Sequence, residues 1–213
     1  MSDTNFSLLG ARDYVHSSSI IEYIYNNYDD LAAWPMGEVL LDIKFYNKFS
    51  SNCFVIVLDA PIGNISEDIV SEAVIRNKSD KRFVYFKRDP NSSDLNSIDV
   101  RYDVDEIERY GDFSGRYKIK SESYTQFIRN LIEANKKIHL QDDKLKGMPV
   151  INVYMRSVPI YLYTNNSWAD LVIKNIGSRS KKNSVTTLNK IKFLSSTGAE
   201  IELDVCFSVS ENS

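Results

Sequence analysis

The stretch SSSIIEYIYN at residues 17–26 decides the interpretation of this chain, because a related stretch occurs a second time. SESYTQFIRN at residues 121–130 aligns with it without gaps, an offset of 104 residues from 17 to 121. Identical residues fall at the first, third, eighth and tenth positions of the pair. Further on, residues 52–63 align with residues 166–177 at an offset of 114. A unit of one helix followed by strands, repeated after about 100 residues, indicates a fused pseudo-dimer.

Composition limits the classes of protein that this chain can belong to. The 213 residues carry a net charge of −3, so no global positive field attracts nucleic acid. Cys53 and Cys206 each lie in a strand-like run, where buried free thiols are expected rather than a disulfide. With two histidines in the chain, a metal site is not expected. No run reaches about 18 apolar residues and no secretory signal is present, so a cytoplasmic protein without a membrane span is expected.

The first half shows one helix and then alternating strands. Ile20, Ile21 and Ile24 have helical spacing, and Ser19-x-x-Glu22 has the form of a capping box, which predicts a helix over 19–28. The predicted strands that follow are 39–49, 53–58, 69–75 and 82–87. The polar stretch 88–99 is the predicted connection to the second half.

The second half has the same order of elements. A strand over 98–104 and a loop over 111–120 precede a helix over 123–138, which begins with the capping box Ser123-x-x-Gln126. The remaining strands are predicted at 150–163 with an interruption at Pro159, at 168–176, and in a hairpin of 184–194 and 199–208 that turns at 195–198. The chain is thus predicted to be α+β, with domains 1–90 and 98–213 and a linker over 91–97. Each domain has an antiparallel sheet wrapped around a central helix.

The lead-in to the second helix resembles a motif of the hotdog-fold superfamily. The β-hydroxyacyl-carrier-protein dehydratases carry a segment of the form GHFPGRPxxPGxxxxE, and residues 111–126 fit it without a gap. The matching residues are Gly111, Phe113, Gly115 and Arg116. Asp112 stands at the family's histidine and Gln126 at its glutamate. In the first half, Arg12 and Glu22 fall on the family's arginine and glutamate, and Leu8 stands at the histidine. The repeat as a whole resembles a double hotdog, as in polyketide acyltransferase/decarboxylase proteins.

The resemblance implies two composite sites, because dehydratase dimers combine the histidine of one subunit with the acid of the other. Leu8 with Gln126 would be inert. Asp112 with Glu22 would give two facing carboxyl groups, which suit general acid/base chemistry. His16 and Tyr117 are the candidate auxiliary catalytic residues.

Arg12, Arg116 and Gln126 are the candidate substrate-binding residues, the arginines as anchors for a pantetheine phosphate. Each candidate also has a plainer explanation. Glu22 and Gln126 could be helix caps, and Asp112 and His16 could be loop residues. The two arginines could clamp loops.

Two functions therefore stay open. The first is binding and processing of an acyl thioester, carried by acyl carrier protein or coenzyme A, with dehydratase-, thioesterase- or acyltransferase/decarboxylase-like chemistry. No bound cofactor is expected, since the substrate itself carries the phosphopantetheine, and a homodimer of double hotdogs is possible on this view. The second is a non-catalytic hotdog that binds an acyl chain or serves as an interaction subunit.

Overall fold

The computed structural model describes residues 3–10, 13–32, 34–35, 39–93, 95–111, 113–140, 150–155, 158–160, 169–181, 184–194 and 200–210. The chain divides into two compact units, one of residues 1–101 with 158–162 and the other of residues 102–157 with 163–213. The predicted linker 91–97 falls within the first unit by this division. The domain limits 1–90 and 98–213 stay predictions.

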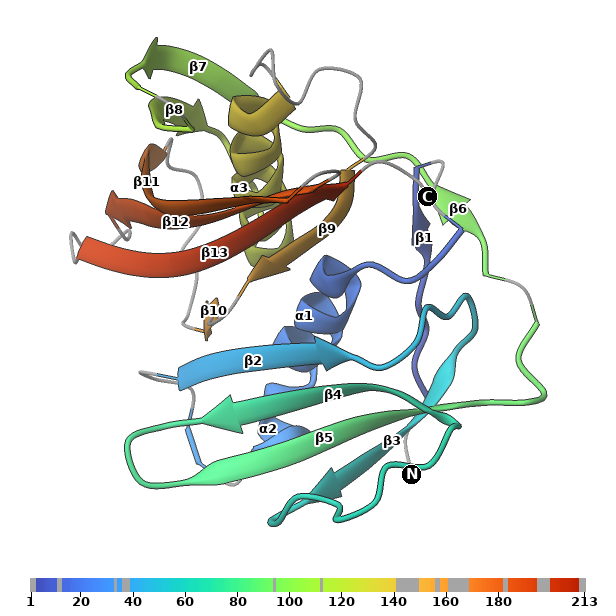
Figure 1. Cartoon of the computed structure of the whole chain (residues 1–213). Helices are drawn as coiled ribbons and strands as arrows, with labels where there is room; N and C mark the ends of the chain where they lie inside the picture. The colour runs from blue at the N-terminus through green and yellow to red at the C-terminus, as the bar shows by residue number, and fades with distance from the viewer. Residues whose placement is uncertain are drawn as a thin grey trace. The chain divides into compact units, whose positions relative to one another are not determined.

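The first unit contains two helices and a five-stranded antiparallel sheet (Figure 1). The helices are α1 (Ser17–Asn26) and the short α2 (Tyr28–Leu31). The sheet has the strand order β10-β2-β4-β5-β3. Its strands are β2 (Val39–Phe45), β3 (Cys53–Leu58), β4 (Ile69–Arg76), β5 (Lys81–Arg88) and β10 (Val158–Ile160). A separate parallel pair joins β1 (Leu8–Leu9) to β6 (Ser97–Ile98).

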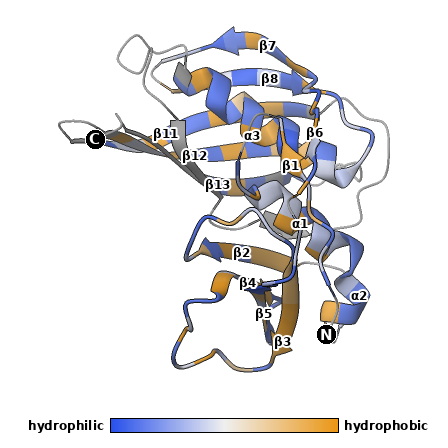
Figure 2. Ribbon diagram, turned by 90° about the vertical axis from the view of Figure 1, so that its right-hand side faces the viewer, coloured by the Kyte–Doolittle hydropathy of each residue, from blue (hydrophilic) through white to orange (hydrophobic). Residues whose placement is uncertain are grey.

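Alternation along the strands builds the core of this unit. Val39, Leu41 and Ile43 of β2 are buried, and the hydrophobic colouring of β2 and β3 in Figure 2 reflects such residues. Helix α1 buries its isoleucines, as the helical spacing predicts. Four aromatic side chains pack against one another in the core: Phe6, Tyr23, Phe49 and Phe86. Their ring centroids lie about 6 Å apart in T-shaped and tilted pairs.

The second unit places the longer helix α3 (Tyr124–Leu140) along one face of a six-stranded sheet (Figure 1). The strand order is β7-β8-β11-β12-β13-β9, with every neighbouring pair antiparallel. The strands are β7 (Val104–Arg109), β8 (Gly115–Ile119), β9 (Val150–Met155), β11 (Ala169–Lys181), β12 (Ser184–Leu194) and β13 (Glu200–Ser210).

The core of the second unit is apolar along the first turns of α3. Phe127 packs on Phe193 of β12 with ring centroids 4.8 Å apart. Ile128 and Leu131 of the helix are also buried, as are Leu171 and Ile173 of β11. Successive residues of a strand point to opposite faces of the sheet. The inward-facing positions of β11 and β12 therefore continue from these buried residues toward the last turns of α3.

Several predicted elements differ from the structure. The predicted loop 111–120 contains β8, whose residues 115, 117 and 119 are buried while 116 and 118 are exposed. The predicted strand 98–104 is replaced by the short β6 and by β7, which begins at Val104. Pro159 does not end a strand but lies in β10, at the edge of a sheet, where a missing N–H is tolerated. The predicted turn 195–198 lies outside the described residues.

Candidate functional site

Tyr117 and Arg116 lie on strand β8 rather than in the predicted loop. The Tyr117 side chain is fully buried, and its hydroxyl donates to Glu106 Oε2 at 3.2 Å. Burial, together with the nearby Glu106 carboxylate, raises the pKa of this phenol above its usual range. Arg116 is exposed and its Nη2 atom lies 2.6 Å from Asp170 Oδ2 on β11. The two side chains therefore point to opposite faces of the sheet, and their predicted roles toward a substrate stay predictions.

Gln126 belongs to the cap of α3. Its backbone N–H donates to Ser123 Oγ at 3.2 Å, and its side-chain Oε1 accepts from the Glu122 backbone N–H at 2.8 Å. The predicted capping box is confirmed, with the side chain reaching one residue further back than the usual motif.

The cap of α1 differs from the prediction. The helix begins at Ser17 and its N-cap is His16, whose Nδ1 accepts from the Ser18 backbone N–H at 3.3 Å. The predicted start at Ser19 is wrong, because Ser19 lies inside the helix and its Oγ is buried without a hydrogen-bond partner among the described residues. The capping residues His16 and Ser123 are thus 107 positions apart, whereas the sequence repeat implies 104.

The remaining predicted residues belong to the proposed composite site. Glu22 lies on α1 and is half-buried. Asp112 and Arg12 lie outside the described residues. The Glu22–Asp112 pair therefore stays a prediction.

A cluster of buried polar side chains interrupts the apolar core near the end of α3. Asn135 and His139, four residues apart on the helix, face Thr187 and Asn189 of β12, and all four are at most 1% exposed. His139 Nε2 forms a short hydrogen bond with Thr187 Oγ1, and Asn189 Nδ2 donates to Asn135 Oδ1 at 2.9 Å. Burying so many polar groups is costly unless they are paired or used, so this polar cluster is the candidate functional site.

The hydrogen bonds of His139 fix its tautomer. Its Nδ1 lies 2.6 Å from the carbonyl oxygen of Asn135, which can only accept, so Nδ1 carries a proton. In the neutral ring, Nε2 is then the acceptor nitrogen and accepts from the Thr187 hydroxyl. A second donor, the N–H of Asn189 Nδ2, lies 3.5 Å from the same atom. This arrangement holds an imidazole nitrogen as a base directly beside a hydroxyl group.

Two further segments hold the polar cluster in place. Asn175 Nδ2 of β11 donates to Asn189 Oδ1 at 2.9 Å, and the Asn175 backbone N–H donates to Ser114 Oγ at 3.0 Å. Directly after Asn175 the register of β11 with β12 shifts, so a β-bulge lies beside the cluster. Bulges are frequent next to active sites, where they redirect a side chain.

Phe113 covers the imidazole of His139. The two rings are stacked with centroids 4.9 Å apart and an interplanar angle of 18°. Phe113 has φ of 53°, in the left-handed region that a bulky side chain rarely adopts, and Gly111 nearby has φ of 72°. Strained backbone of this kind is concentrated at functional sites.

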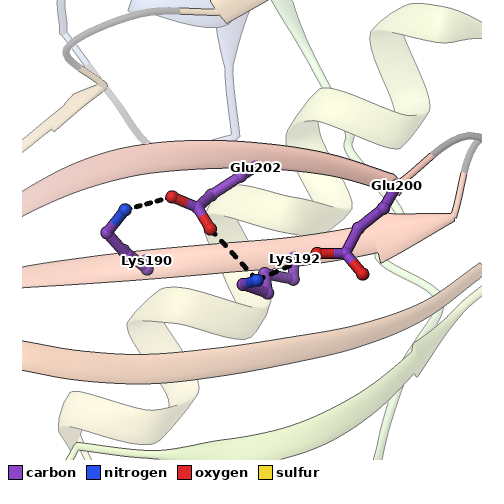
Figure 3. A network of polar contacts seen from close by, with 4 residues as sticks. All are labelled: Lys190, Lys192, Glu200 and Glu202. Carbon is purple, nitrogen blue, oxygen red and sulfur yellow. Dashed lines mark hydrogen bonds and ion pairs between the residues drawn. The ribbon is translucent and has the colours of Figure 1, made fainter.

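The opposite face of the same strands carries a different arrangement, a ladder of charges (Figure 3). Lys192 of β12 contacts Glu200 at 2.9 Å and Glu202 at 3.2 Å on β13, and Lys190 pairs with Glu202. Lys190, followed by Lys192, lowers the pKa of the Glu202 carboxyl. These exposed pairs stabilise little, so the ladder marks the solvent-facing side of the sheet.

Two further findings concern the part of the chain that the structure describes. Among them, no group of three or more His, Cys, Asp or Glu side chains is positioned to hold a metal ion. None of the helices they form is long and apolar enough to cross a membrane. Cys53 is a buried free thiol, as predicted. The side chain of Cys206 is outside the description.

Comparisons with known proteins identify the fold. No protein-family model matches the sequence, and no curated protein is similar to it. Solved structures do match. The dehydratase domain of RzxB from Pseudomonas fluorescens is 9% identical with a TM-score of 0.52, over 98% of this chain and 93% of that one. The CurJ dehydratase, an inactive mutant in complex with a compound, is 10% identical with a TM-score of 0.51, over 95% and 84%.

A third match is a conserved protein of unknown function with a hot dog fold from Alicyclobacillus acidocaldarius. It is 6% identical with a TM-score of 0.50, over 94% of this chain and 89% of that one. The chain has the hotdog fold, and the predicted α+β class is confirmed. At such low identities the matches show the fold alone.

Proposed function

We propose that this chain binds and processes acyl thioesters at the polar cluster of its second unit. The observation that carries the proposal is the pairing of the His139 imidazole with the Thr187 hydroxyl inside an otherwise apolar hotdog core. An acyl thioester combines an apolar chain with one reactive polar group. A core that is apolar around Phe127 and Phe193 and polar around His139 offers both environments along one helix.

Acid/base chemistry at a thioester needs a nitrogen or oxygen base held in one orientation. His139 meets this requirement, since the Asn135 carbonyl fixes its tautomer and Phe113 stacks on its ring. Two of the matched structures are dehydratases by name, and this likeness supports the same substrate class here by analogy of fold.

The finer parts of the proposal concern the carrier and the setting. The acyl group is carried by acyl carrier protein or coenzyme A through phosphopantetheine, in fatty-acid or polyketide-type biosynthesis in the cytoplasm. The protein acts alone or as a homodimer of double hotdogs. The pairing of Glu22 with Asp112 and the role of Arg12 stay predictions from the sequence for the same substrate class.

Turnover of acyl coenzyme A and of acyl-carrier-protein thioesters tests the proposal. We expect the His139→Gln variant to lose about 100-fold or more in kcat/KM, because glutamine removes the base. Asn130→Ser is the matched control. Asn130 is fully buried on the same helix, where it donates to Lys120 O at 2.7 Å, and it belongs to no contact of the polar cluster. A similar loss in both variants would indicate general destabilisation and contradict a reacting centre at His139.

A non-catalytic hotdog that binds an acyl chain is the second candidate. It is favoured by the structural partners of four predicted site residues: His16 and Gln126 cap helices, Arg116 pairs with Asp170, and Tyr117 donates to Glu106. Saturable binding of acyl thioesters by the wild-type protein without turnover would favour this candidate.

A further inference from the structure

We propose that Thr187 is a nucleophile that takes the acyl group from the thioester as an ester, with His139 as its general base. The inference rests on the proposed function and narrows it to one class of reaction. The chain would hydrolyse acyl thioesters, or transfer their acyl groups, rather than dehydrate them.

The position of Thr187 suits a nucleophile. It lies in the middle of the sheet, where β12 pairs on one side with Ser178 of β11 and on the other with Phe207 of β13. Central strands hold their side chains rigidly, and a β-branched residue has few rotamers. The Thr187 hydroxyl hydrogen-bonds with His139 Nε2, the nitrogen that the fixed tautomer leaves as acceptor. A nucleophile, a base and a third group that orients the base form the general arrangement of activated hydroxyl groups in enzymes.

The side-chain amide of Asn135 supplies a donor for the oxyanion. Its Oδ1 accepts from Asn189 Nδ2 at 2.9 Å, which orients the amide plane. Its Nδ2 is buried and has no hydrogen-bond partner among the described residues. A buried amide N–H without a partner costs free energy, and preorganised donors of this kind stabilise the negative charge that develops on a carbonyl oxygen.

The reaction balances with water as the only co-reactant. Thr187 Oγ1 bonds to the thioester carbonyl carbon while its proton moves to His139 Nε2. The C–S bond then breaks, and the leaving thiolate takes that proton and departs as the thiol. Water next attacks the Thr187 ester, giving a proton to Nε2. The C–O bond to Thr187 breaks and Oγ1 recovers the proton, so thioester and water become carboxylic acid and thiol.

Access to this pair passes Phe113. Thr187 and His139 are at most 1% exposed, and the Phe113 ring lies on the imidazole. Its left-handed φ and the positive φ of Gly111 belong to the same short loop before β8. Displacement of this ring would expose the imidazole to a substrate, and its return would exclude bulk water from the thioester.

The test uses the full chain with hexanoyl coenzyme A as the probe. For the wild type we expect release of coenzyme A and, after acid quenching, a hexanoyl mass increase on the peptide that contains Thr187. Thr187→Val keeps the shape and removes the hydroxyl, so it should lower kcat/KM about 100-fold or more. Thr187→Ser keeps a hydroxyl and should retain the acyl adduct at the same position.

The outcomes separate the two proposals. If the wild type neither binds nor cleaves hexanoyl coenzyme A or a hexanoyl carrier protein, the proposed function fails. If Thr187→Val is folded and loses less than about twofold in rate, only the inference about Thr187 is overturned. In that case His139 would activate water instead. If Thr187→Val does not fold, the wild type and Thr187→Ser decide: an adduct on residue 187 in both supports the inference, and its absence from both overturns it.

Discussion

Replacement of Asn189 by alanine tests whether the polar cluster is one coupled network. Asn189 Nδ2 donates to Asn135 Oδ1, and its Oδ1 accepts from Asn175 Nδ2, both at 2.9 Å. In Asn189→Ala the fully buried Asn135 Oδ1 loses its partner, which costs about 1–3 kcal/mol. The bond from Asn175 contributes about 1 kcal/mol, because the half-buried Asn175 amide can still donate to Gly177 O. We therefore expect a loss of about 2–4 kcal/mol in the stability of the second unit.

The double variant carries the sharper expectation. In a chain that already carries Asn135→Ala, the Asn189→Ala change leaves no unpaired acceptor on α3. The loss of stability in the double variant should therefore be about 1–3 kcal/mol smaller than the sum of the two single losses. Native-state hydrogen exchange of amides in α3 and β12 is the appropriate measurement, because a chain of two units need not unfold in one transition. Asn130→Ala, on the same helix but with no contact to the cluster, is the control, and its effect should add to that of Asn189→Ala within about 0.5 kcal/mol. Additivity of Asn135→Ala and Asn189→Ala within about 0.5 kcal/mol would refute the coupling.

Three further expectations concern separate parts of the chain. His16→Ala should destabilise the first unit by about 1 kcal/mol in urea unfolding, whereas His16→Asn, which restores a cap acceptor, should recover most of it; equal losses would contradict the cap. Burial raises the pKa of the Cys53 thiol from 9.0 to about 12, so the stability that the protonated thiol contributes is complete below pH 9 and is lost as the pH rises toward 12. In Cys53→Ala the free energy of unfolding should therefore decline less steeply at alkaline pH than in the wild type. Equal slopes for the two proteins would contradict this role of Cys53. Phe113→Ala should lower the melting temperature and slow the cleavage of hexanoyl coenzyme A, because the ring orients the imidazole and excludes bulk water; a faster reaction would show that the ring only blocks access to His139.

Local patterns predicted most of the elements, because alternation and helical spacing report burial directly. Leu41 and Ile43, for example, are inward residues of β2 as their spacing indicates. The start of α1 was predicted wrongly because Ser19-x-x-Glu22 has the form of a cap while the histidine three positions earlier makes the actual bond. The loop prediction over 111–120 is wrong for residues 115–119, although the alternation of β8 is present in the same residues.

The polar cluster illustrates what a linear pattern leaves undetermined. Asn135 and His139 are one helical turn apart, and Thr187 and Asn189 are two apart on a strand, so each pair shares a face. Polar residues at inward positions of apolar runs were therefore a usable signal. Their convergence depends on packing of α3 against β12 over about 50 positions of sequence, which spacing alone does not give.

Strand β10 determines which fragment of this protein can be expressed as a separate first unit. The strand comes from residues 158–160, far along the chain, yet it pairs with β2 and forms one edge of the first sheet. A fragment ending at residue 101 would lack it and would expose the backbone donors and acceptors of β2. Leu40, already 39% exposed, lies on that strand. Such a fragment would present an unpaired strand edge to other copies, so residues 1–101 expressed alone should aggregate rather than give a soluble domain.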